Sequence, residues 1–135
     1  MATSIIKWVN GKTFVGTDST KHSVVLSTPD EGVGIKPSEL LMLALGACTA
    51  VDVVEILAKK RTPLTGLEIQ VNGEQDSEAP WAFHAVHLKY ILKGAGLQPK
   101  DVDQAIRLSE EIYCSVAATI RGVAKIDYEF EILPE

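Results

Sequence analysis

The stretch SELLMLALGACTAVDVVEIL, residues 38–57, decides the fold, because it contains the longest apolar run of the chain. Ser38 is a typical N-cap residue, so we expect a long helix from there to about Lys60. The first half of this helix is apolar on all sides, which predicts burial on every face. The apolar run from Leu40 to Val51 is twelve residues long. A membrane span needs roughly 20 residues, so the run predicts a core helix.

Short segments of β-forming residues, separated by turn residues, lie on both sides of this helix. Alternation of polar and apolar residues predicts strands at 4–9, 12–17, 22–28, 67–75, 81–93 and 124–134. Asn10-Gly11 is a strong signal for a hairpin between the first two strands. Helical spacing predicts two further helices, near 99–113 and 115–122. The order β-β-β-α-β-β-α-α-β predicts an α+β fold with antiparallel sheets, in a single domain over residues 1–135.

The predicted helix near 99–113 also has a face that is expected to be buried. The residues at helical spacing on this face are Val102, Ala105, Ile106, Ser109, Ile112 and Tyr113.

The central helix is more apolar than one covering sheet can bury. Its second side needs another sheet or another subunit, because soluble monomers rarely expose an apolar patch that large. We therefore expect a homodimer that encloses these helices between its two chains.

Composition excludes several classes of function. The 135 residues carry a net charge of −5, and nucleic-acid binding normally needs a basic face. The N-terminal segment has no apolar run long enough for a signal peptide. The only two cysteines, Cys48 and Cys114, are 66 residues apart. Together these features predict a protein of the reducing cytoplasm, without a disulfide framework, a metal site or a membrane span.

Cys48 lies in the middle of the long helix and begins a polar stripe. Asp52, Glu55 and Lys59 follow on nearly the same helical face. One interpretation is a solvated stripe whose first member is a small residue. The other is a reactive thiol at the boundary between core and water. Carboxylates alone raise the pKa of a thiol, so this second interpretation requires a nearby cation.

Cys114 lies at the predicted joint between two helices. A cysteine beside a helix N-terminus is favoured as a thiolate. Arg107 and Arg121 lie seven residues before and after it, on the same helical faces. Each arginine is interpreted either as a surface or ion-pair residue or as a group that acts on the thiol.

These two cysteine contexts resemble a known family. KPSELLMLALGACTAVDVV, residues 36–54, and YCSVAATIRG, residues 113–122, are similar to motifs of the osmotically inducible protein C / organic hydroperoxide resistance (OsmC/Ohr) family. The similarity extends over nearly the whole chain. It implies an intertwined homodimer, with antiparallel sheets wrapped around the central helices.

The resemblance also implies a chemistry. By analogy Cys48 is the peroxidatic cysteine and Cys114 the resolving cysteine, and the oxidant is an organic hydroperoxide. A dithiol or a lipoylated protein would restore both thiols, with no metal or organic cofactor. The apolar substrate pocket would include Leu41, Met42 and Leu45.

One feature of the family is not recognisable in this chain. In well-characterised members an N-terminal arginine and a glutamate near the helix start flank the reactive thiol. Here no arginine precedes Arg61. The glutamate position matches Ser38, and Glu39 lies one residue later, roughly opposite Cys48 on a regular helix. The cations left for this role are Lys21, His22 and Lys36, or Arg107 and Arg121.

Three functions follow from the sequence. The first is a thiol peroxidase that uses Cys48 and Cys114 in defence against oxidative stress. The second is a protein of the same fold that binds a small molecule or acts in stress without peroxidase chemistry. The third is an unrelated fold that wraps a sheet around a helix, such as a hot-dog thioesterase.

Overall fold

The computed structural model describes all 135 residues. The chain divides into two compact units, Met1–Leu41 and Met42–Glu135. The central helix α1 (Pro37–Lys59) begins in the first unit and continues into the second. That the whole chain acts as one domain stays a prediction.

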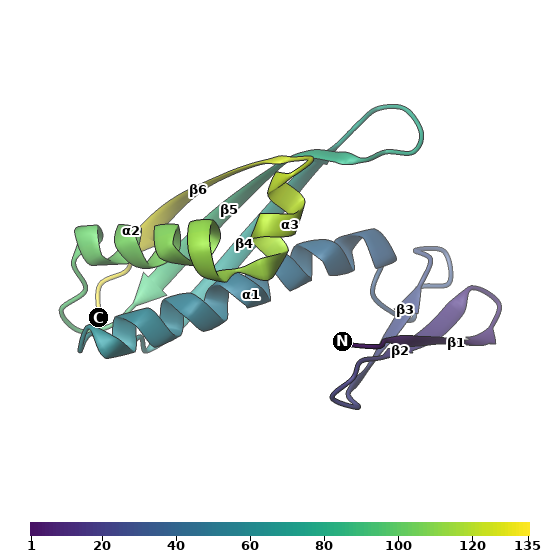
Figure 1. The fold of residues 1–135 in the computed structure, drawn as a ribbon, viewed down its shortest axis with the longest axis horizontal. Helices are drawn as coiled ribbons and strands as arrows, with labels where there is room; N and C mark the ends of the chain where they lie inside the picture. The colour runs from purple at the N-terminus through teal and green to yellow at the C-terminus, as the bar shows by residue number, and fades with distance from the viewer. The chain divides into compact units, whose positions relative to one another are not determined.

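The first unit is a three-stranded antiparallel sheet in the order β1-β2-β3 (Figure 1). Its strands are β1 (Ile5–Asn10), β2 (Thr13–Thr17) and β3 (Ser23–Ser27), within a residue or two of the predicted bounds. Gly11, with a φ of 49°, begins the two-residue turn between β1 and β2. The turn therefore comes one residue later than the Asn10-Gly11 signal predicts.

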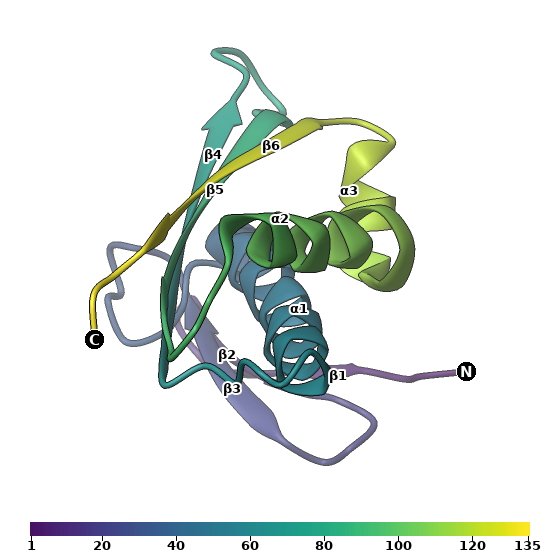
Figure 2. The same ribbon diagram turned by 90° about the vertical axis from the view of Figure 1, so that its left-hand side faces the viewer.

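The second unit is a three-stranded sheet in the order β4-β5-β6, with helices on one face. Its strands are β4 (Gly66–Gln75), β5 (Phe83–Lys93) and β6 (Lys125–Ile132). Its further helices are α2 (Pro99–Leu108) and α3 (Ser115–Arg121). Figure 2 shows α1, α2 and α3 on the same side of this sheet. The observed element order is the predicted one, and the α+β class is confirmed.

The expectation of antiparallel sheets is wrong for one pair of strands. β4 and β5 pair antiparallel, but β5 and β6 pair parallel, with Leu88 opposite Tyr128. The physical reason is the connection between them. A hairpin reverses the chain, whereas α2 and α3 cross over the sheet and return the chain to the end where β5 began.

The hydrophobic core of the second unit lies between its sheet and its helices. Along β5 the side chains alternate, so that Val86, Leu88, Tyr90 and Leu92 face inward. They pack with residues of α1 and α2, which include Leu45, Val53, Leu57, Val102, Ala105 and Ile106. This cluster fixes one face of α1 on the sheet.

The other face of α1 is not covered by the sheet and helices of the second unit. Leu43, Val51 and Val54 are 54%, 65% and 45% exposed, and they recur at helical spacing. The predicted burial on every face is therefore found on one side only. The helix has 23 residues and contains an 18-residue stretch with a mean hydropathy of 2.1, so by length and composition alone it could cross a membrane. Its packing against β5 identifies it as a core helix, as the sequence predicts.

A π-helical turn, η1 (Ser109–Tyr113), joins α2 to Cys114. It changes which residues face the core. Ser109 and Glu110 are buried, while Ile112 and Tyr113 are 65% and 61% exposed. The sequence prediction that Ile112 and Tyr113 lie on the buried face is therefore wrong, because a π-turn adds a residue to one turn and rotates everything after it.

Candidate functional site

Cys48 lies on α1 at the edge of the buried face. Its side chain is half-buried and packs against the core cluster. Asp52, one turn later, accepts a hydrogen bond from the Ser109 hydroxyl at 2.8 Å. Glu55 pairs with Lys59 at 3.2 Å on the exposed surface. The polar stripe that begins at Cys48 thus has a partly buried, hydrogen-bonded member at Asp52 and a solvated end at Glu55 and Lys59.

Cys114 lies between η1 and α3 and is 2% exposed. Its backbone N–H donates to the Ser109 carbonyl at 2.7 Å, which closes the π-turn. Its sulfur caps α3 by accepting the backbone N–H of Ala117 at 3.3 Å. Two local structures therefore fix the position of this thiol.

The fold brings these two cysteines together. Burial raises the pKa of the Cys114 thiol to about 11, and a hydrogen bond with Cys48 contributes to that shift. Both cysteines are free thiols. Cys114 therefore keeps its proton at neutral pH, beside Cys48. A buried thiol that keeps its proton is a poor nucleophile.

The other predicted site residues do not form one cluster with the two cysteines. Glu39 is exposed in the first turn of α1. Met42 and Leu45 are 7% and 0% exposed, and both belong to the core cluster. Leu41 is 42% exposed. A substrate pocket built from Leu41, Met42 and Leu45 stays a prediction, as does the role of Glu39.

The cations considered from the sequence have separate surroundings. Arg107 pairs with Asp103 at 2.9 Å on α2. Arg121 is exposed at the end of α3, where its charge acts on Glu110. Lys21 lies in an exposed turn with a φ of 67°, and Lys36 is also exposed. Among these, Arg121 is the cation whose field reaches the buried groups beside Cys114.

Sequence reasoning missed a buried polar group next to the cysteines. Glu110 is 6% exposed, and its carboxylate accepts the Tyr90 hydroxyl at 3.4 Å. Burial is the largest cause that raises the pKa of Glu110, to about 7. Burial also raises the pKa of Tyr90, and the charges of Glu110 and Cys114 add to that rise. Glu110 lies inside the π-turn, which no periodicity predicts, so the sequence offers no signal for this group.

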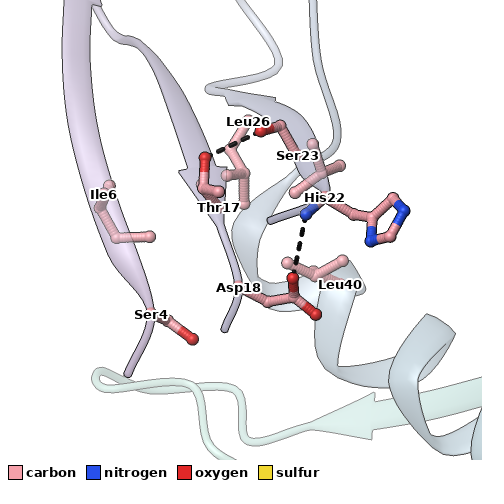
Figure 3. Close-up of a pocket in the computed structure, with 10 residues that line it drawn as sticks. Ser4, Ile6, Thr17, Asp18, His22, Ser23, Leu26 and Leu40 are labelled. Atoms are coloured by element: carbon pink, nitrogen blue, oxygen red, sulfur yellow. Dashed lines mark hydrogen bonds between the residues drawn. The ribbon is translucent and has the colours of Figure 1, made fainter. Parts of the chain in front are cut away.

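The first unit has a hollow of its own, of about 360 Å³ (Figure 3). Ile6, Leu26 and Leu40 provide apolar lining. Asp18 and His22 stand at its polar edge, where the Asp18 carboxylate accepts the backbone N–H of His22 at 3.1 Å. The hollow has the apolar lining and few polar groups typical of a small-molecule site.

Comparison with known proteins identifies the family. A sequence profile described as OsmC-like protein matches residues 29–129. The chain belongs to the OsmC family. Protein YhfA of Escherichia coli (strain K12) is 34% identical over 128 residues, which cover 95% of this chain and 96% of that protein. Family membership sets aside the hot-dog thioesterase alternative.

Solved structures of other proteins share this fold. A hypothetical protein from Aquifex aeolicus VF5 is 27% identical, with a TM-score of 0.84 over 99% of this chain and 98% of that one. The organic hydroperoxide resistance protein OhrB of Bacillus subtilis is 15% identical, with a TM-score of 0.65 over 97% of this chain and 98% of that one. At that identity OhrB supports the fold alone.

Proposed function

We propose that this OsmC-family protein is a thiol peroxidase that reduces organic hydroperoxides in the cytoplasm. The observation that carries the proposal is the Cys48–Cys114 pair, in which Cys114 holds its proton next to Cys48. Two free thiols far apart in sequence but adjacent in the fold are the arrangement that a dithiol peroxidase needs. The family membership is consistent with this chemistry.

The reaction has two oxidative steps. The Cys48 thiolate attacks the outer oxygen of the O–O bond, and the alkoxide leaves and takes a proton to become the alcohol. Cys48 is now a sulfenic acid. Cys114 attacks the sulfenic sulfur, water is lost, and a disulfide joins the two residues. A dithiol or a lipoylated protein then supplies two electrons and two protons to restore both thiols.

Cys48 is the residue that we place as peroxidatic, and Cys114 as resolving. Because burial and the shared hydrogen bond raise the pKa of Cys114 to about 11, it is the poorer first nucleophile at neutral pH. The apolar residues around Cys48 on α1 suit an organic hydroperoxide better than hydrogen peroxide. Glu39 acts on Cys48 only if a partner chain or a loop rearrangement carries it there.

A homodimer completes this proposal. The exposed stripe of α1 consists of Leu43, Ala47, Val51, Val54 and Ala58. These residues lie on one helical face, and a second copy of the chain would cover them. Cys48 is beside this stripe, so the dimer interface would also shield the thiol from bulk water.

A second candidate function is supported by the apolar hollow among residues 4–40. The protein would then bind a small apolar molecule without peroxidase chemistry. The absence of an arginine before Arg61 favours this alternative, because such an arginine stabilises the thiolate in peroxidatic relatives. It predicts two thiols that hydroperoxides do not oxidise, and a ligand that copurifies with the protein.

Turnover of cumene hydroperoxide, with dihydrolipoamide as the reductant, separates the two functions. We expect turnover by the wild type and none by Cys48→Ser, and we expect slower turnover with hydrogen peroxide. His84→Gln, an exposed change on β5 beside Asp76, is the matched control and should turn over like the wild type. Equal rates for the wild type and Cys48→Ser would overturn the peroxidase proposal.

A further inference from the structure

A line of buried polar side chains crosses the core close to the two cysteines. It consists of Glu110 on η1, Tyr90 on β5 and Thr49 on α1, which are 6%, 0% and 0% exposed. The Tyr90 hydroxyl donates to Glu110 at 3.4 Å, whereas the Thr49 hydroxyl donates to the Gly46 carbonyl at 3.1 Å. Thr49 directly follows Cys48 in the chain. These buried polar side chains therefore come from the helix that carries Cys48 and from the turn that precedes Cys114.

Burial of these polar side chains, and of the Glu110 carboxyl group above all, costs folding free energy. An ionised carboxyl group removed from water is stable only with good partners, and Glu110 has a single long hydrogen bond and no ion pair within 4 Å. An apolar residue at position 110 would fill the same space without that cost. A buried acid with so little support, next to a reactive pair, is typical of a functional group.

The turn that carries Glu110 is firmly positioned. Ser109, its neighbour, donates to Asp52 on α1 at 2.8 Å and accepts the backbone N–H of Cys114 at 2.7 Å. Glu110 thus has a fixed place relative to both thiols. Cys114 is also close enough to Tyr90 for its charge to raise the pKa of the tyrosine.

We propose that Glu110, acting through Tyr90, takes up the proton of Cys114 when Cys114 attacks oxidised Cys48. This inference rests on the redox pair of the proposed function and assigns Glu110 as its positioning residue. In the step, Cys114 first moves within hydrogen-bond reach of Tyr90, and its thiol proton then passes to the Tyr90 oxygen as the Tyr90 proton moves to Glu110. The Cys114 sulfur forms the bond to Cys48, and the group on the Cys48 sulfur departs with the bonding electron pair. When that group is hydroxide, the proton on Glu110 converts it to water.

Charged groups from several elements act on Glu110. Arg121 on α3 favours its carboxylate, whereas Glu111 on the same turn and Asp127 on β6 oppose it, as burial does. Tyr90 on β5 donates to the carboxylate and so favours it. Since the pKa of Glu110 is about 7, the fraction able to accept a proton changes within the physiological range.

Ellman's reagent tests this step without any peroxide. Cys48 attacks the reagent and releases one coloured thiolate, and the attack of Cys114 on the resulting mixed disulfide then releases a second. The rate of the second release, which does not depend on reagent concentration, reports disulfide closure alone. It is measured from pH 6 to 9 for the wild type, Glu110→Gln and Glu111→Gln. Glu111 is exposed and adjacent, so Glu111→Gln makes the same change of charge outside the core.

We expect closure in the wild type to rise with pH and level off above about 7, as Glu110 becomes ionised. Glu110→Gln should slow closure at pH 8 by about a hundredfold, the lower range of general base catalysis. Its rate should then keep rising with pH toward the pKa of Cys114, about 11. Glu111→Gln should reach the wild-type plateau, and its rate should level off at a slightly lower pH, because the charge of Glu111 raises the pKa of Glu110. Tyr90→Phe, which keeps the carboxylate but removes the hydroxyl, should show the same loss as Glu110→Gln.

Unchanged rate and pH dependence in Glu110→Gln would overturn the inference, and so would the lack of a second release in the wild type. Slowed closure in Glu111→Gln to the same extent would also overturn it, because a general charge effect would then explain the loss. If closure depends on Glu110 but hydroperoxide leaves Cys48 unoxidised, the inference stands and the peroxidase function fails.

Discussion

The two faces of strand β5 carry similar polar groups in opposite surroundings. On the inner face the Tyr90 hydroxyl donates to Glu110, and both side chains are buried. On the outer face His87 contacts Asp127 through one ring nitrogen and Glu129, at 2.7 Å, through the other. Those outer side chains are 38% to 59% exposed.

The two faces differ in how strongly water and salt screen a hydrogen-bonded charge. Water and salt screen the outer cluster, so its interactions contribute little and can be changed without consequence for the core. The inner pair has no such screening, and its protonation is linked to its neighbours, including Cys114. We therefore expect changes on the inner face to alter chemistry and stability, and changes on the outer face to alter neither by much.

The largest contrast concerns the fate of oxidised Cys48. Cys114→Ser removes the thiol that we propose as resolving, so the sulfenic acid should accumulate and react with dimedone, while turnover with a dithiol drops. In His87→Gln, on the outer face of β5, oxidation should proceed to the disulfide as in the wild type. Mass spectrometry after one equivalent of cumene hydroperoxide distinguishes the two. If His87→Gln were labelled by dimedone as strongly as Cys114→Ser, the expectation that changes on the outer face leave disulfide formation unaffected would be wrong.

The second contrast is in packing. Leu88 is fully buried on the inner face, and Leu88→Ala should lower the free energy of unfolding by about 2 to 5 kcal/mol through lost contacts and a cavity. Ile91, on the outer face, is only partly buried, so Ile91→Ala should cost less. Urea unfolding of both variants measures the difference. Equal losses would mean that something covers the outer face of the sheet in solution.

The third contrast is the pH dependence that Glu110 brings. Its pKa rises from an ordinary 4.5 to about 7 in the folded chain, so the folded state binds the proton more tightly than the unfolded state. The resulting stability is fully present below pH 4.5 and is lost as pH rises to about 7. We expect a fall on the order of 2 to 3 kcal/mol over that window. Glu110→Gln should not show this fall, which denaturant unfolding at several pH values would measure.

The smallest contrast is at His87. Its carboxylate partners, Asp127 first and then Glu129, raise the pKa of His87 above 6.5. Its contribution is therefore complete below pH 6.5 and is lost as pH rises through the raised value, a higher window than that of Glu110. Because the cluster is exposed, the effect should be under about 1 kcal/mol and should shrink in salt. A thermal melt of His87→Gln from pH 6 to 9, with and without added salt, checks both points.

Local pattern predicts most of the architecture. The strands at both ends, the long helix from residue 37 and the α+β class follow from alternation, helical spacing and turn residues. The parallel pairing of β6 with β5 does not, because alternation is the same for both pairings and the direction depends on the path of α2 and α3. The register after Leu108 fails for a related reason. A π-turn depends on how its side chains pack, so Glu110 joins Ser109 in the core, while Ile112 and Tyr113 are exposed although spacing predicts them to be buried.

The residues of the candidate site also fall into two groups, those that the sequence predicts and those that it does not. The motif contexts of Cys48 and Cys114 point to both cysteines from the sequence, and the fold then brings their thiols together. Glu110 and Tyr90 escape sequence reasoning, because an acid in a run of polar residues and a tyrosine in a strand look ordinary until their burial is known. No spacing rule relates Tyr90 to Glu110, since they come from separate elements that meet only in the core.

The proximity and reactivity of the two thiols are the central claim, and peptide mapping of the wild type tests it most directly. The reduced protein is treated with one equivalent of cumene hydroperoxide, blocked with an alkylating reagent, digested and analysed by mass spectrometry. We predict one linked peptide that joins Cys48 to Cys114 within the same chain, with no free thiol left. Two alkylated cysteines, or Cys48 oxidised to sulfinic acid beside an alkylated Cys114, would contradict the claim.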